Sequence, residues 1–169
     1  MATARSIVRQ AFFDRLEEDD SFFQFYDDLS DTEIQDIADE RANTLINEAI
    51  ILLKRKCEPD IDFVIDISGI KDEFVDTLTA EEILLLGGDL AFEVYLGRKV
   101  AKMQTRINTF SSSDLKALHS PANERKSFMD MYKQIQAENQ VKISDYASRN
   151  RLTGKFVSVN VDGVGYDES

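Results

Sequence analysis

The side chains that most often carry out catalysis are few and scattered in this sequence. His119 is the only histidine, which excludes the paired-histidine zinc site of many metalloproteases. It follows Ser111–Ser113 in a polar stretch, but nothing in the sequence would hold it in place as a general base. Cys57, the only cysteine, has no histidine near it, so we interpret it as a packed thiol rather than a nucleophile. We predict no catalytic residues and no enzymatic activity.

Carboxylates are abundant, and three of them suggest a cation site at first sight. Asp60, Asp62 and Asp66 resemble a calcium loop, but the glycine and the closing glutamate of such a loop are missing at the required places. Neighbouring acids elsewhere are interpreted as solvated faces and helix starts. Nothing marks any two of them as the pair that hydrolyses a glycoside. We therefore predict no metal and no other cofactor.

The composition fits one folded domain with an acidic surface. The chain has 169 residues, of which 43% are hydrophobic, and a formal net charge of -12 from 32 acidic and 20 basic residues. Such a surface repels phosphate backbones, so nucleic-acid binding as a primary function is disfavoured. The charge serves solubility in the first place, and it would also keep passing DNA from adhering.

Neither a secretory signal nor a membrane span is expected. Met1–Gln10 lacks an apolar signal core, and the apolar run Ile83–Leu86 is far too short to cross a bilayer. A single cysteine fits a reducing compartment. We expect a soluble cytoplasmic product, or a part of an assembly formed there.

The first half of the chain is predicted to form two helices. Residues 3–17 have apolar side chains on one side, and a capping box at Ser30–Glu33 begins a second helix that continues to about Leu53. An aromatic group lies between them: Phe22, Phe23, Phe25 and Tyr26. We favour its packing as an anchor for the N-terminal arm, and the alternative is a contact surface for a neighbouring subunit.

A long helical hairpin is predicted in the second half. Its first arm begins at a capping box, Thr79–Glu82, and continues to about Ile107; its second arm begins at Pro121 and continues to Ser148. Gly87-Gly88 in the first arm indicates a close helix crossing or a bend. Asn139 interrupts the apolar stripe of the second arm, which predicts looser packing there.

Extended structure is predicted in two places. Alternating apolar residues over 61–67 favour a short strand, which must pair with the C-terminal tail or with another subunit. We divide the chain into a helical domain, 1–152, and an extended tail, 153–169. The tail residues assigned to docking on a partner are Phe156, Val157, Val159, Val161 and Val164. A frayed end, or a strand folded back onto 61–67, is an equal alternative.

The order of these features resembles a known family, the head-to-tail connector (adaptor or head-completion) proteins of tailed bacteriophages. The pattern Phe-x-x-x-Leu-Thr-x-x-Glu-Ile at Phe74–Ile83 precedes the long apolar helix, and the Ser-x-Ala-Asn turn at Ser120–Asn123 follows it. Tyr132 and Tyr146 then stand at the expected distances, and Ala49-Ile50 is similar in style to the end of the family's earlier helix.

The resemblance implies a mainly α structural protein of the virion. Such a subunit assembles with copies of itself into a ring, expected to be a dodecamer, in the neck at the head–tail interface after synthesis in the host cytoplasm. Its partners would be the portal protein and a tail-proximal neck or tail-completion protein, with no membrane, and DNA would pass through the channel without specific binding. The alternative is an acidic helical protein-interaction or regulatory module of a cell, which would remain a monomer.

Overall fold

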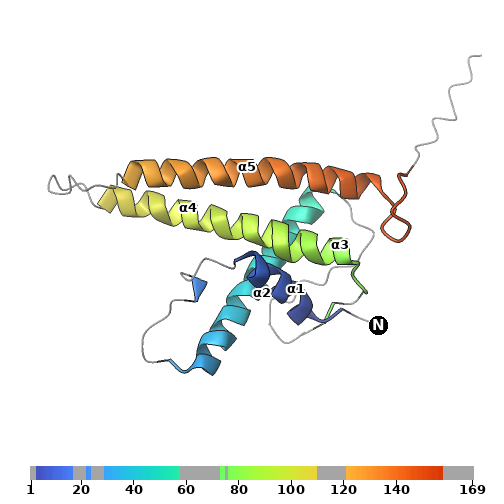
Figure 1. The fold of residues 1–169 in the computed structure, drawn as a ribbon, viewed down its shortest axis with the longest axis horizontal. Coiled ribbons are helices and arrows are strands. Elements are labelled where there is room, and N and C mark those ends of the chain that lie inside the picture. The colour runs from blue at the N-terminus through green and yellow to red at the C-terminus, as the bar shows by residue number, and fades with distance from the viewer. Residues whose placement is uncertain are drawn as a thin grey trace, which may run out of the picture.

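The described part of the chain in this computed structural model is mainly helical (Figure 1). It comprises residues 3–16, 22–23, 29–57, 73–74, 76–109 and 121–157. The helical elements in chain order are α1 (Arg5–Arg15), α2 (Asp31–Lys56), α3 (Ala80–Ile83), the π-helical segment Leu84–Leu90, α4 (Ala91–Thr109) and α5 (Pro121–Ser148). The predicted mainly α fold is therefore confirmed.

The predicted extended segments are largely outside the described residues. This holds for the strand at 61–67 and for the tail beyond Val157. Within the described ranges, β pairing is limited to isolated bridges between Ala4 and Glu73 and between Arg149 and Phe156. The polar connection that contains Ser111–Ser113 and His119 also lies outside the described residues.

The elements pack as a hairpin crossed by α2. The chain continues from α3 through the π-helical segment into α4, and α5 returns antiparallel beside α4 (Figure 1). Helix α2 crosses this hairpin obliquely, while α1 packs against the π-helical segment and α2. The π-helical segment is thus covered by α1 and α2, which explains why its glycines and its leucines are buried, apart from Leu84, which is 60% exposed.

Both predicted capping boxes are present. The Ser30 amide donates to Glu33 Oε2 at 2.9 Å, and the Glu33 amide donates to Ser30 Oγ at 3.4 Å. Thr79 and Glu82 make the same reciprocal pair at 2.7 and 3.3 Å. Each box satisfies backbone donors that the first helical turn leaves without a partner, so α2 and α3 begin where the sequence predicts.

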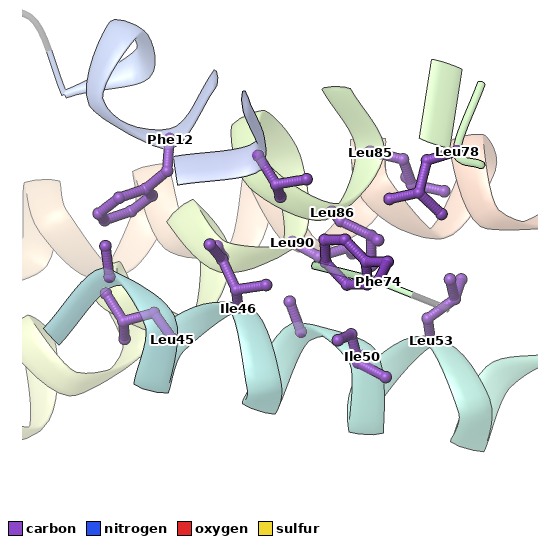
Figure 2. Close-up of a cluster of buried hydrophobic side chains, with 14 of the residues drawn as sticks. Phe12, Leu45, Ile46, Ile50, Leu53, Phe74, Leu78, Leu85, Leu86 and Leu90 are labelled. Atoms are coloured by element: carbon purple, nitrogen blue, oxygen red, sulfur yellow. The ribbon is translucent and has the colours of Figure 1, made fainter. Parts of the chain in front are cut away.

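The core lies between α2, α1 and the first arm of the hairpin (Figure 2). Side chains at three- and four-residue steps along α2 face the leucines of the π-helical segment, which gives α2 its broad buried stripe. The labelled members of this cluster are Phe12, Leu45, Ile46, Ile50, Leu53, Phe74, Leu78, Leu85, Leu86 and Leu90. In α1, Val8 and Phe12 are buried, but Ile7, placed on the same side by the sequence, is 50% exposed because one residue turns a helix by about 100°.

Gly87 marks a close helix crossing, one of the two predicted explanations for the glycine pair. A Cβ at Gly87 would lie 2.3 Å from the backbone oxygen of Val8 and 3.1 Å from Ala11 Cβ. At Gly88 the nearest atom would be 3.7 Å away, which is ordinary contact. Only Gly87 is therefore required for α1 to approach the hairpin backbone this closely.

The prediction of loose packing at Asn139 is wrong. Its side chain is 2% exposed, and Nδ2 donates to Glu93 Oε2 at 2.9 Å and to the Asp89 carbonyl at 3.2 Å. An amide on an apolar stripe can be well packed when the facing helix supplies acceptors. The stripe of α5 is narrower than predicted, since Ile143 and Tyr146 are buried while Ala147 is exposed.

Candidate interaction site

The chain that follows α5 forms a closed turn with exposed apolar side chains. The Asn150 amide donates to the Lys155 carbonyl at 2.8 Å, and the Val157 amide donates to the Ser148 carbonyl at 2.9 Å. Gly154 adopts φ +64°, a conformation that favours glycine. This turn includes residues on both sides of position 152/153, where the sequence predicts the boundary between the helical domain and the extended tail.

Two of the predicted docking residues lie on this turn. Phe156 and Val157 are 67% and 60% exposed, and the Arg149 guanidinium lies 4.6 Å from the centroid of the Phe156 ring. Leu152 is 78% exposed on the same turn. The other predicted docking residues, Val159, Val161 and Val164, lie outside the described residues. The described part of the tail therefore presents apolar groups in a fixed geometry.

A buried ionic cluster holds this turn against the start of the hairpin. Arg151 donates to Glu82 Oε1 from Nε at 2.8 Å and to Glu82 Oε2 at 3.0 Å, and a further bond reaches the Thr77 carbonyl at 2.8 Å. The Tyr146 hydroxyl donates to the same carboxylate at 2.9 Å. We call Glu82, Tyr146 and Arg151 the C-terminal clasp. It joins the end of α5 to the capping box of α3.

The surroundings of the clasp shift the pKa of each member. Burial alone would raise the pKa of Glu82, but hydrogen bonds from Arg151, from the Thr79 amide and from Tyr146 outweigh it, so this pKa lies below its ordinary value. Burial, and then the adjacent Glu82 carboxylate, raises the pKa of Tyr146. The hydrogen bond to Glu82 raises the pKa of Arg151. At neutral pH, Glu82 and Arg151 are therefore charged, and the Tyr146 phenol is neutral.

The aromatic group of the N-terminal arm lies partly in the core. Phe22 is 4% exposed and makes edge contacts with Phe12 and Tyr95, at centroid distances of 5.4 and 5.6 Å. Phe23 is half-buried against it. Phe22 thus packs as an anchor for the N-terminal arm, the favoured prediction. Its side chain is covered by its own chain and is not available to a neighbouring subunit. Phe25 and Tyr26 lie outside the described residues.

A groove of about 540 Å³ lies where α2, α4 and α5 meet. Ile51 and Leu52 line one wall, Tyr132 and Gln136 line the other, and α4 supplies the floor with small side chains at two successive turns. We call this the Glu93 groove, after the buried acid in its lining. Its remaining lining residues are Glu48, Arg55, Glu93, Val94, Gly97, Arg98 and Ala101. A smaller hollow of about 360 Å³ shares Leu52, Glu93 and Gln136 with it.

The sequence did not single out this groove. Its signal was present: an acid, Glu93, stands inside an apolar helix between Leu90 and Leu96, and Gly97 and Ala101 follow on the same face. No catalytic constellation accompanies it. Among the described residues, no group of three or more His, Cys, Asp or Glu side chains is placed to hold a metal ion.

Another hollow, of about 300 Å³, lies between Phe22, α2 and α4 and has a basic rim. Three of its four lining cations, all but Lys102, are engaged within the chain. Arg41 donates to the Phe22 carbonyl at 3.1 Å, and Lys99 lies 5.2 Å from the Phe128 ring centroid. Arg98 is salt-bridged to Glu48. This hollow is therefore a less open site than the Glu93 groove.

Of the residues singled out for chemistry, only Cys57 lies within the described ranges. Burial raises the pKa of the Cys57 thiol, which disfavours the reactive thiolate. The three aspartates at 60, 62 and 66 and His119 lie outside the described residues.

The chain matches no known protein, whether compared with family models, with curated proteins or with solved structures. Across the part of the chain that the structure describes, no helix is both long and apolar enough to cross a membrane.

Proposed function

We propose that this chain is a structural subunit of the neck of a tailed bacteriophage. Copies of it form a ring that joins the portal to the tail or to the next neck protein and extends the DNA channel. The proposal begins from the connector-like order of motifs in the sequence. It assigns the chain a role in binding and assembly, with no chemical turnover.

The observation that carries most weight is how the resembling elements pack. The Thr79–Glu82 box begins a long hairpin, and Tyr146 near its end donates to Glu82 of the same box. The capping box in the first motif of the connector-like pattern and the tyrosine that closes this pattern thus meet in one buried cluster. Beyond it, Phe156 and Val157 stand exposed on an ordered turn, which suits contact with the portal or a neighbouring subunit.

The acidic composition is consistent with this role. A subunit with net charge -12, repeated around a channel, would create a negative field that repels the DNA backbone. Duplex DNA would then pass without adhering. Tight duplex binding by the assembled ring at physiological ionic strength would contradict this part of the proposal.

The alternative, an acidic interaction or regulatory module of a cell, also has an observation in its favour. The described core, from Val8 to Tyr146, packs within one chain. A stable monomer is therefore physically reasonable.

Electron microscopy of the purified chain, alone and mixed with portal particles, separates the two proposals. Rings seated on the portal are expected for the neck subunit. Monomers that never assemble, even in the presence of portals, would favour the regulatory module and contradict the neck role. Deleting residues 153–169 should remove portal attachment while the helical circular dichroism signal is kept.

A further inference from the structure

The Glu93 carboxylate is buried with little compensation. Its side chain belongs to a residue that is 7% exposed, and it accepts a hydrogen bond from Asn139 Nδ2 at 2.9 Å. The described residues provide no other hydrogen bond and no ion pair to it. Buried carboxylates are normally paired with a cation or with several donors, because removing the charge from water is costly. The structure of a single chain thus leaves one half of a charged pair.

Glu93 lines an open groove between α2, α4 and α5. Gly97 and Ala101 lie one and two turns further along α4, and the Tyr132 ring packs over Gly97, where an added Cβ would be 3.2 Å from its hydroxyl oxygen, so this ring borders the groove on that face of the helix. Ile51 and Leu52 line one side of the groove with apolar surface. An aliphatic chain that ends in a cation fits this arrangement, because its methylene groups would cover apolar surface and its charge would meet Glu93.

Among the described residues, the cations near the groove form no ion pair with Glu93 and bind elsewhere or lie at its edge. Arg98 forms a salt bridge with Glu48, and Lys56 Nζ donates to Gln140 Oε1 at 2.9 Å. Arg55 lines the rim of the groove and is exposed. No ion pair between Arg55 and Glu93 forms in the described structure. The described residues therefore supply no complementary charge to Glu93, and a second copy can supply one.

The exposed side of α5 carries suitable cations. Lys126 and Lys133 are seven residues apart, which places them on one side of the helix. Both are exposed, and neither forms a hydrogen bond or ion pair within the described ranges. We infer that the Glu93 groove binds the Lys126–Lys133 face of α5 from a second copy of this chain. The contact would bury a lysine ammonium group against Glu93.

This inference rests on the self-assembly in the proposed function and gives it a specific contact. Neither lysine lines the groove, although Lys133 is one turn from Gln136 in its wall, so the two surfaces adjoin on α5 and each copy can still give and receive one contact. Repetition of such a contact builds a ring when the rotation between copies closes. A reciprocal pair, in which two copies exchange their α5 faces, is the other geometry that uses the same residues.

The first test measures oligomeric mass by analytical ultracentrifugation over a range of protein concentrations. Glu93→Gln keeps the size of the side chain and an acceptor for Asn139 but removes the charge. We expect Glu93→Gln, and separately the double variant Lys126→Glu/Lys133→Glu, to weaken self-association by about tenfold or more. Their combination should add little to either, because both remove the same contact.

The matched control is Lys54→Glu/Lys102→Glu, which changes the net charge equally at exposed lysines that do not line the groove. It should associate like the unmodified chain. Circular dichroism and the thermal midpoint of each variant show whether lost association is lost folding. A folded Glu93→Gln variant that associates normally would overturn the inference, as would a control that weakens association equally.

The second test identifies the contact directly in the unmodified chain. A carbodiimide couples a carboxylate to an amine only when they are in contact, and mixing ¹⁵N-labelled with unlabelled chains separates links between copies from links within one. A peptide joining residue 93 of one copy to residue 126 or 133 of another is expected. Links confined to one copy, or a chain that stays monomeric at all concentrations, would overturn the inference.

The two tests distinguish a failure of the groove contact from a failure of the proposed neck role. Rings that form without the link to residue 93 contradict the groove contact and leave the neck role standing. A linked species that stops at a dimer supports the groove contact and contradicts the ring.

Discussion

Arg151 and Glu82 are 69 positions apart in the chain, yet they form a bidentate salt bridge with N–O distances of 2.8 and 3.0 Å. Glu82 is 1% exposed, while Arg151 retains some access to solvent. The pair connects the first turn of α3 to the turn that presents Phe156 and Val157. The pair, together with the Arg151 bond to the Thr77 carbonyl, therefore ties the exposed apolar turn to the opposite end of the hairpin's sequence.

Removal of Arg151 should destabilise the fold measurably. Arg151→Ala leaves the Glu82 carboxylate buried without its cation, and we expect the free energy of unfolding to fall by about 2–4 kcal/mol. Urea denaturation followed by circular dichroism measures this change. Lys155→Ala, at an exposed side chain on the same turn, should change it by less than about 0.5 kcal/mol. Equal effects of the two variants would show that the clasp contributes no specific stability.

Stability should also depend on pH through Glu82. The pKa of Glu82 is lower in the folded chain than its ordinary value of 4.5, so the unfolded chain binds more protons as the pH falls through this range. The contribution of Glu82 is therefore fully present above about pH 4.5 and is lost as the pH falls through the lower, folded pKa.

The variant Glu82→Gln isolates this contribution, because Glu33, whose pKa is lowered by hydrogen bonds with Ser30, titrates in both proteins. The difference in unfolding free energy between the unmodified chain and Glu82→Gln should be largest near neutral pH. It should shrink below about pH 4.5. A difference that stays constant from pH 7 to pH 3 would contradict the assignment.

Asn139 should stabilise the fold because its side chain donates a hydrogen bond to the buried Glu93 carboxylate. In Asn139→Ala, the buried Glu93 loses its hydrogen-bond donor, and we expect a loss of about 1–3 kcal/mol in the unfolding free energy. Gln134→Ala, which removes an exposed hydrogen bond to Glu138 on the same helix, should have little effect. The double variant Glu93→Leu/Asn139→Leu should recover much of the loss, since replacing both polar partners leaves no buried group unsatisfied. Additive losses in the double variant would argue against a direct pair.

The features that the sequence predicted are those with local causes. Both capping boxes depend on residues three positions apart, and the buried stripe of α2 depends on helical spacing, so each was visible in a short window. Pro121 and Ser148 bound α5 as predicted for the same reason.

The missed features depend on which faces meet in three dimensions. Asn139 and Glu93 are 46 positions apart, and only the rotation of α4 against α5 makes an interrupting amide into a buried partner. Glu82 was recognised for its capping role, while its bond to Arg151 depends on the path of the turn after α5. Of the docking residues, Phe156 and Val157 are placed on an exposed turn, and the interaction assigned to them stays a prediction.

The adjacent glycines Gly87 and Gly88 offer a test of the helix crossing with a built-in control. In Gly87→Ala, the added Cβ would lie 2.3 Å from the Val8 carbonyl oxygen, so α1 must move away from the hairpin. We expect the free energy of unfolding to fall by about 2–3 kcal/mol, the range for overpacked cores. Chemical denaturation measures the change.

Gly88→Ala makes the same chemical change one residue later, where the nearest atom is 3.7 Å from the added Cβ. Alanine is favoured over glycine in a helix by about 1 kcal/mol, so this variant should be neutral or slightly more stable. The opposite signs at neighbouring positions would arise from contact with α1 alone, because the two substitutions share their helical context. Equal destabilisation by both would show that the glycines are needed for the π-helical backbone itself rather than for the crossing.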